Sequence, residues 1–230
     1  MVRLVLFDID GTLIQTGGAG VRAFGKTFET AFGLPSGTEH LKFAGRTDSS
    51  LVREFLASHG LDLTAENLQH FYDCYVFWLD HLLGQCHGRT CPGVWSFLSD
   101  LQSLAQPPAF GLLTGNIRLG AEIKLRHYEL WGLFSTGAFG DDHEHRDELA
   151  AIAQRRASRA LGRKLRGDEI LVVGDTPHDI SCAKAIGARS LAVATGGHPV
   201  EELRSLEPTW AVAELTEARA SEVCSAKRAG

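Results

Sequence analysis

The chain has 230 residues, of which 44% are hydrophobic and 22% are charged, so it has enough apolar side chains for one sizeable core and is neither disordered nor fibrous. Its 23 Lys and Arg residues against 28 Asp and Glu residues give a formal net charge of -5, which argues against a general nucleic-acid surface or an anionic-membrane surface. An anionic substrate would therefore need a local positive site.

The cysteines and the apolar runs indicate a cytoplasmic protein. There are five cysteines, an odd number, and no two are spaced as C-x-x-C, so neither a disulfide framework nor a zinc knuckle is expected. The apolar run within residues 1–7 is too short for a signal peptide. No stretch of about 18 consecutive apolar residues predicts a membrane-spanning helix.

The first predicted strand covers residues 4–7 and is followed by two acids, Asp8 and Asp10. A carboxylate that closes a buried strand costs free energy unless it is paired or bound to a metal ion, which makes Asp8 a candidate functional residue. Asp10 precedes Gly11, so it is either a second functional acid or part of an ordinary Asp-Gly turn.

Residues 17–88 predict an inserted helical unit. Apolar stripes at helical spacing run through residues 51–59 and 68–82, and the second stripe is rich in aromatic residues. Glycine-rich segments at residues 17–20 and 88–93 flank the region, and two such linkers side by side would make a hinge.

The remainder of the chain alternates between strand and helix patterns. Continuous apolar runs predict buried strands at 109–113, 170–173 and 190–193, and apolar stripes predict helices over 119–130 and 149–161. This alternation is typical of a doubly wound, Rossmann-like α/β fold with a parallel sheet. We expect a core of residues 1–15 and 90–230, interrupted by a helical cap of residues 16–89.

Polar residues also follow the next two strands. Thr114, Gly115 and Asn116 come after residues 109–113, where they form either an anion site at a helix N-terminus or an ordinary helix cap. After residues 170–173, Asp175 is a candidate cation ligand, and Asp179 is either a further ligand or the cap of the helix that Pro177 begins.

Because ligands bind at the carboxyl ends of strands in open α/β sheets, these side chains are expected to share one site. So many carboxylates within a few ångströms repel one another unless a cation lies among them, and oxygen ligands favour Mg²⁺. The predicted cluster consists of Asp8, Asp10, Thr114, Asp175 and Asp179.

The motifs at residues 8–12 (Asp-x-Asp-Gly-Thr), 114–116 (Thr-Gly-Asn) and 174–179 (Gly-Asp-Thr-x-x-Asp), with a helical insertion soon after the first, resemble those of the haloacid dehalogenase-like superfamily. More narrowly, the chain is similar to the phosphoglycolate phosphatase-like members with a small helical cap. The resemblance implies an Mg²⁺-dependent hydrolase that acts on a small phosphate monoester through an aspartyl-phosphate intermediate.

The resemblance also implies roles for single residues. Asp8 would be the nucleophile, and Asp10 the general acid and then the base for water. Thr114 would bind phosphoryl oxygens with nearby backbone N–H groups, including those of Gly115 and Asn116. Asp8, the backbone carbonyl of Asp10 and Asp175 would hold the Mg²⁺ ion, with Asp179 in support.

The chain departs from the family at one catalytic position. The family normally supplies a Lys between the second and third motifs to neutralise the nucleophile and the phosphate, and here Arg146, at the start of a predicted helix, has the matching place. Arg keeps the charge but is bulkier and is not equivalent to Lys. Lys124 and Lys164 are the alternatives, and both are expected to be solvated surface charges.

The substrate is expected to be a small phosphorylated metabolite, with neither nucleic acid nor a membrane as partner. Arg46, in a cap segment with Thr47 or Asp48 as a possible helix N-cap, would meet a carboxylate or second phosphate of the substrate, or else simply face solvent. Two alternative functions stay open: a phosphomutase related to β-phosphoglucomutase, and a phospho-acceptor signalling module like a response-regulator receiver. The sequence indicates neither the substrate nor the oligomeric state.

Overall fold

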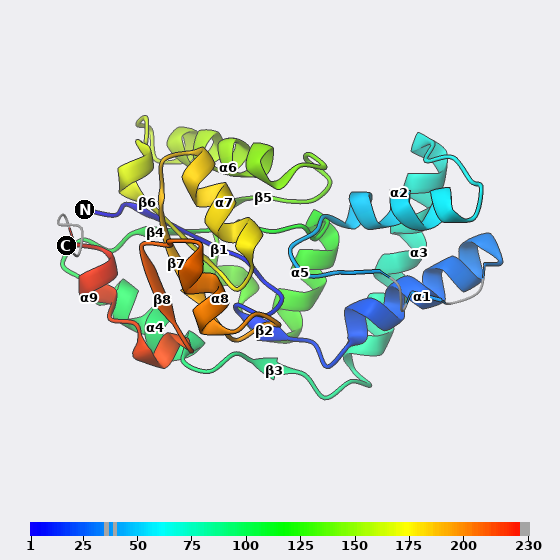
Figure 1. The fold of residues 1–230 in the computed structure, drawn as a ribbon, viewed down its shortest axis with the longest axis horizontal. Coiled ribbons are helices and arrows are strands. Elements are labelled where there is room, and N and C mark those ends of the chain that lie inside the picture. The colour runs from blue at the N-terminus through cyan, green and yellow to red at the C-terminus, as the bar shows by residue number, and fades with distance from the viewer. Residues whose placement is uncertain (35–36, 39–40, 226–230) are drawn as a thin grey trace.

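A parallel sheet forms the centre of the computed structural model, which describes residues 1–34, 37–38 and 41–225 (Figure 1). The sheet has six strands in the order β5-β4-β1-β6-β7-β8, and every neighbouring pair is parallel. The chain builds outward from β1 first on one side and then on the other, so β1 lies at the switch point of a doubly wound sheet. The strands are β1 (Leu4–Phe7), β4 (Ala109–Leu113), β5 (Thr136–Ala138), β6 (Ile170–Gly174), β7 (Arg189–Val193) and β8 (Trp210–Val212).

Helices cover both faces of the sheet, which explains why the strands are continuous apolar runs. In β1, Val5 and Phe7 pack into the cluster formed with α4, α5 and α9, whereas Leu4 and Leu6 pack into the cluster formed with α6 and α7. The helices of this core are α4 (Val94–Gln102), α5 (Arg118–His127), α6 (Arg146–Ala160), α7 (Pro177–Ala185), α8 (Val200–Ser205) and α9 (Ala220–Val223).

Three helices form a separate unit, which we call the helical insertion; it lies at the right of Figure 1. They are α1 (Ala19–Phe32), α2 (Asp48–Ser58) and α3 (Ala65–Leu83). Aromatic and aliphatic side chains form the hydrophobic cluster between them, and the rings of Phe28 and Phe55 stack with centroids 3.6 Å apart. The insertion therefore has its own apolar core, as the two sequence stripes predict.

The chain enters and leaves the helical insertion through two paired segments. β2 (Ile14–Gln15) and β3 (Arg89–Thr90) are antiparallel, with Ile14 opposite Thr90. The pair lies at the predicted boundaries of the cap. That the insertion is a domain that moves about this pair stays a prediction.

The structure differs from the sequence prediction at two edge strands and one helix face. β5 and β8, three residues each, have no counterpart among the predicted strands. In α5, the predicted apolar stripe is only partly right: Leu119 is 51% exposed, whereas Ile123 packs against the insertion and Leu130 is buried. Ala121 and Leu125 are buried in place of Leu119. None of the described helices combines the length and the apolar character that crossing a membrane requires.

Candidate active site

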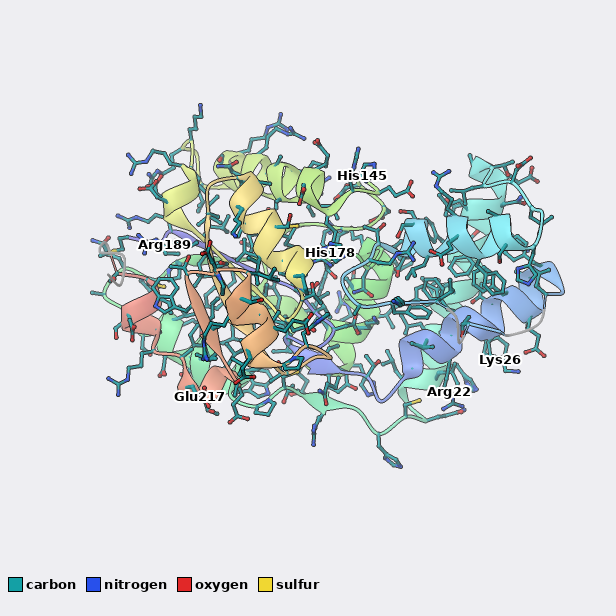
Figure 2. All side chains as sticks on the ribbon, in the orientation of Figure 1. Arg22, Lys26, His145, His178, Arg189 and Glu217 are labelled. Carbon is teal, nitrogen blue, oxygen red and sulfur yellow. The ribbon has the colours of Figure 1, made fainter. Side chains whose placement is uncertain are left out.

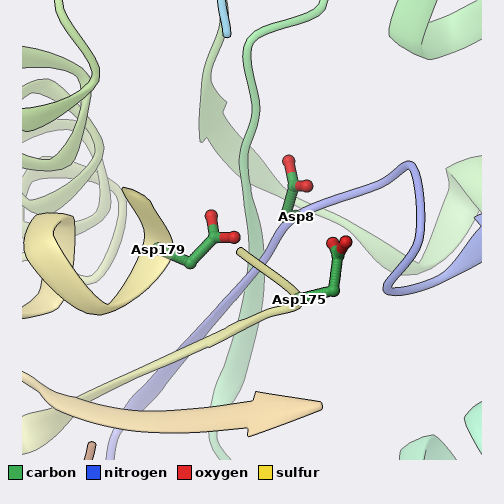
Figure 3. Close-up of side chains that lie close together, drawn as sticks. All are labelled: Asp8, Asp175 and Asp179. Carbon is green, nitrogen blue, oxygen red and sulfur yellow. The ribbon is translucent and has the colours of Figure 1, made fainter. Parts of the chain in front are cut away.

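Three buried carboxylates meet where β1 and β6 end. Asp8 follows β1, Asp175 follows β6, and Asp179 lies in the first turn of α7. Figure 3 shows the three side chains converging, and each offers a carboxylate oxygen that lies within 4.8 Å of the others. The adjacent carboxyl ends of β1 and β6 thus bring together acids that are more than 160 residues apart in sequence.

Burial changes the acidity of this cluster. Burial raises the pKa of Asp8 to about 7, against the opposing effect of the Arg146 guanidinium. Burial also raises the pKa of Asp175 well above its usual value, and the charge of Asp8 adds to this effect. Oxygen donors so close together are stable as carboxylates when a cation lies among them, and they fit the preference of Mg²⁺ for oxygen ligands.

The position of Asp175 depends on two glycines that pack against its carboxylate. Gly11 has φ +85°, and a Cβ there would lie 2.4 Å from Asp175 Oδ2. A Cβ on Gly196 would lie 1.7 Å from the same oxygen. Thr12 Oγ1 donates a hydrogen bond of 2.9 Å to Asp175 Oδ1. The glycines make room for the carboxylate, and Thr12 sets its orientation.

Asp179 has neighbours at both carboxylate oxygens. Its Oδ2 accepts hydrogen bonds from the backbone N of Thr176 at 3.0 Å and from Thr176 Oγ1 at 2.7 Å, which completes a capping box at the start of α7. Its Oδ1 lies 2.5 Å from Arg146 Nη2. Both carboxylate oxygens of Asp179 therefore have a donor within the chain, and whether Asp179 also binds a metal ion stays a prediction.

Arg146 begins α6, as predicted, and its side chain is only 7% exposed. Its Nη2 lies 3.4 Å from Asp8 Oδ1, in addition to the contact with Asp179. Burial alone would lower the pKa of Arg146, but the carboxylates of Asp179 and Asp8 raise it above its ordinary value. A permanent positive charge therefore lies against Asp8, where the sequence places the positive partner.

The prediction that Lys124 is a solvated surface charge is wrong. The residue is 4% exposed, and its Nζ lies 2.6 Å from Asp10 Oδ2 and 2.7 Å from Asn116 Oδ1. The site thus holds two cations, with Arg146 on Asp8 and Lys124 on Asp10. Lys164 is exposed, as expected.

The segment after β4 is not the predicted helix N-terminus. α5 begins at Arg118 with Ile117 as its N-cap. The backbone N–H of Ile117 donates to Asp48 Oδ2 at 2.8 Å, and that of Arg118 donates to Asp141 Oδ1 at 3.0 Å. Protein carboxylates therefore already occupy the start of α5.

Thr114 lies before this helix and is fully buried. Its Oγ1 accepts hydrogen bonds from the backbone N of Asn116 at 3.3 Å and from Asn116 Nδ2 at 2.9 Å. The hydroxyl of Thr114 and the backbone N–H of Gly115, for which the described residues provide no hydrogen-bond acceptor, are the groups left to meet an anion.

A cavity of about 320 Å³ lies between this edge of the sheet and the helical insertion. The sheet edge lines its floor with Asp8, Asp10 and Thr114, and cations from two helices, Lys124 and Arg146, also reach it. The insertion contributes a largely apolar wall. The residues of that wall include Val21, Phe24, Phe43, Leu51 and Tyr75.

Arg46 also lines the cavity, but a protein carboxylate already neutralises it. Its Nη1 lies 2.5 Å from Glu54 Oε2, and its Nη2 donates to the backbone O of Ser50 at 3.2 Å. The predicted contact of Arg46 with a second anionic group of the substrate would have to compete with Glu54.

The segment at the start of α2 fastens the insertion to the core. Thr47 is the N-cap of α2, and its Oγ1 donates to the backbone O of Glu144 at 2.9 Å. The backbone N of Asp48 donates to Gly115 O at 2.8 Å, and Asp48 Oδ2 accepts from Ile117 N. Burial raises the pKa of Asp48 to about 7, while the charge of Lys124 lowers it.

Side chains from the core reach the insertion as well. Glu144 accepts two hydrogen bonds from Arg53 Nε and one of 2.9 Å from Arg53 Nη2. His178, labelled in Figure 2, extends from α7 to Gly45, where a Cβ would lie 2.5 Å from His178 Cδ2. These contacts join the insertion to the core beside the cavity.

Two residues that line the cavity were given other places by the sequence: Lys124 was an alternative to Arg146 but was expected at the surface, and Asp48 was a possible helix cap. Lys124 shares a face with the buried Ala121 and Leu125, and this spacing was the available signal that it points inward. Asp48 was considered only as a helix cap. Its contact with Ile117, 69 residues away, has no signal in the local sequence.

A model of the family described as haloacid dehalogenase-like hydrolase matches residues 5–193. The probable phosphatase IndB of Dickeya dadantii is 25% identical, with 94% of this chain and 92% of that protein covered. The pyrophosphatase PpaX of Oceanobacillus iheyensis is 28% identical, with 93% of this chain and 94% of that protein covered.

The fold also matches solved structures. A crystal structure described as HAD hydrolase, family IA, variant 3, from Entamoeba histolytica superposes with a TM-score of 0.76 and 20% sequence identity. The match covers 97% of this chain and 98% of that one, so the shared fold includes the helical insertion as well as the sheet.

Proposed function

Because this chain belongs to the haloacid dehalogenase-like hydrolase family, we propose that it is a phosphatase that hydrolyses a small phosphate monoester with Asp8 as the nucleophile. The observation that carries the proposal is the buried meeting of Asp8 and Asp175 beside Arg146, on the floor of a cavity that Asp10 also lines. The relatives named phosphatase and pyrophosphatase support the same reaction class.

In the first half of the reaction, a carboxylate oxygen of Asp8 attacks phosphorus and the bond from phosphorus to the leaving oxygen breaks. Asp10 gives its proton to that oxygen. In the second half, the Asp10 carboxylate takes a proton from water as the water oxygen attacks phosphorus, which releases inorganic phosphate and restores Asp8.

The chain's own cations lower the cost of bringing two anions together. Arg146 lies against Asp8, and the Thr114 hydroxyl with the Gly115 backbone N–H faces the position of the phosphoryl oxygens. Mg²⁺, held by Asp8, Asp175 and the backbone carbonyl of Asp10 with Asp179 in support, would supply further charge neutralisation.

A cavity of about 320 Å³ suits a small substrate, and closure of the insertion over the bound substrate would exclude bulk water during phosphoryl transfer. All five cysteines are free thiols, which supports action in the reducing cytoplasm.

The proposal is tested by phosphate release from p-nitrophenyl phosphate and a panel of phosphorylated metabolites, with Mg²⁺ and with excess chelator. We expect many turnovers with Mg²⁺ and none with chelator, and the Asp8→Asn variant should be inactive yet folded. Asp100→Asn, an exposed acid of α4, is the matched control.

Substantial activity in Asp8→Asn would place the nucleophile elsewhere. Release of no more than one phosphate per protein would favour the phospho-acceptor module. Phosphate that stays on the organic product would favour the phosphomutase.

A further inference from the structure

We propose that Lys124 is a positioning residue, which fixes the carboxylate of Asp10 for proton transfer to the leaving group and is itself held in place by the helical insertion. The inference rests on the proposed phosphatase function and concerns a residue outside the three sequence motifs.

Lys124, Asn116 and Asp10 form a closed ring of hydrogen bonds. Lys124 Nζ donates to Asp10 Oδ2 at 2.6 Å and to Asn116 Oδ1 at 2.7 Å. Asn116 Nδ2 donates to the same Asp10 oxygen at 2.8 Å and to Thr114 Oγ1 at 2.9 Å. An ammonium group only donates, so it fixes the amide of Asn116 with its oxygen toward Lys124 and its nitrogen toward Asp10.

This ring leaves the other oxygen of Asp10 available. Oδ2 accepts two hydrogen bonds, whereas Oδ1 has no hydrogen-bond donor among the described residues. The Asp10 side chain is 41% exposed and lines the cavity, so without the ring little else would restrict its rotation. The ring therefore selects one orientation of the carboxyl group and points its free oxygen at the substrate space.

The insertion encloses Lys124 from the other side. Gly20, in the first turn of α1, lies over the ammonium group, and a Cβ there would be 3.5 Å from Nζ. Ile117 and Ile123, seven residues and one residue before Lys124, pack into the hydrophobic cluster of the insertion. A Lys side chain that is 5% exposed costs free energy unless it is paired, and among the described residues Asp10 is the one carboxylate within ion-pair distance of it.

The arrangement therefore has a kinetic consequence that a merely structural ion pair lacks. Proton transfer to the leaving oxygen matters most when that oxygen is strongly basic, as in an alkyl phosphate, and little when the leaving group is already a stable anion, as in p-nitrophenyl phosphate. The value of kcat/KM reports the steps up to departure of the leaving group, and so separates this role of Asp10 from its later role with water.

The test compares kcat/KM of Lys124→Met with wild type on an alkyl phosphate that the wild type hydrolyses and on p-nitrophenyl phosphate. Met keeps the length and packing of the side chain and removes its charge. We expect a loss on the order of 10²-fold on the alkyl ester and less than about 3-fold on the aryl ester. Asp10→Asn should show the same pattern, and the double variant should lose no more than Asp10→Asn alone. Lys164→Met is the matched control.

Equal losses on the two esters, additive losses in the double variant, or no loss at all would each overturn the role of Lys124. If Lys124→Met does not fold, Lys124→Leu, which likewise has no hydrogen-bond donor, is measured by the same criteria. Failure of the wild type to hydrolyse either ester with Mg²⁺ would instead overturn the proposed function, so the two failures are distinguishable.

Discussion

At the residue scale, two cationic side chains each contact a different carboxylate of the site. Arg146 contacts Asp8, whose oxygen forms the new bond to phosphorus, and Lys124 contacts Asp10, which moves the proton. Loss of Arg146 should therefore affect every substrate, whereas loss of Lys124 should affect only those with basic leaving groups.

The Arg146→Ala variant should lower kcat/KM by roughly 10²–10³-fold on alkyl and aryl phosphates alike, because the charge lost is the one that faces the nucleophile and the phosphoryl group. Arg146→Lys should recover part of the loss. Arg155→Ala, an exposed arginine of the same helix, should match wild type. A loss confined to the alkyl ester would contradict this division of roles.

Asp8 and Asp175 could be proposed from the sequence because each comes at the end of an apolar run, at the sheet edge where ligands bind. The burial of Lys124 was not predicted, because the stripe through Leu119 and Ile123 suggested a different buried face of α5 and outweighed the spacing of Ala121, Lys124 and Leu125. Which side of a short helix faces a neighbour depends on the neighbour, and here that neighbour is the insertion.

At the scale of elements, α5 joins the insertion to the sheet edge. Asp48 of α2 accepts the backbone N–H of Ile117 at the start of α5, and Lys124 lies further along the same helix. The edge strands β5 and β8 were not predicted, because each has only three residues. Their extended conformation depends on pairing with a longer neighbouring strand rather than on their own residues.

The contact between α2 and α5 should depend on pH through Asp48. Burial raises the pKa of Asp48 to about 7 in the folded protein, from an ordinary value of 3.8, and Asp10 and Asp141 act in the same direction. The charge of Lys124 and the hydrogen bond from Ile117 oppose this shift. A raised folded-state pKa contributes stability that is complete below the unfolded value and is lost as pH rises through the folded value.

We therefore expect the free energy of unfolding of wild type, minus that of Asp48→Asn, to fall as pH rises from about 4 to about 7, by up to about 4 kcal/mol. Asn keeps an oxygen that accepts the Ile117 N–H, so the comparison isolates the charge. Urea unfolding at several pH values measures the difference. A difference that stays flat or rises over this range would contradict burial as the dominant cause.

At the scale of the whole molecule, two hydrophobic cores meet around one cavity. The core of the sheet fixes the carboxylates, the aromatic core of the insertion supplies the apolar wall, and hydrogen bonds at Thr47, Asp48 and Arg53 hold the two together. The sequence allowed the sheet and the insertion to be predicted separately, since each has its own periodicity. How they face one another depends on contacts between distant residues that leave no local pattern.

The central claim is that Asp8 becomes phosphorylated during turnover. It is tested most directly in the Asp10→Asn variant, which lacks the base for the second half of the reaction, by mixing with p-nitrophenyl phosphate and Mg²⁺, quenching with acid and mapping the peptides by mass spectrometry. The account predicts a burst of about one p-nitrophenol per protein and one phosphoryl group on Asp8. A phosphoryl group on another residue, or no phosphorylated peptide while wild type turns over, would contradict it.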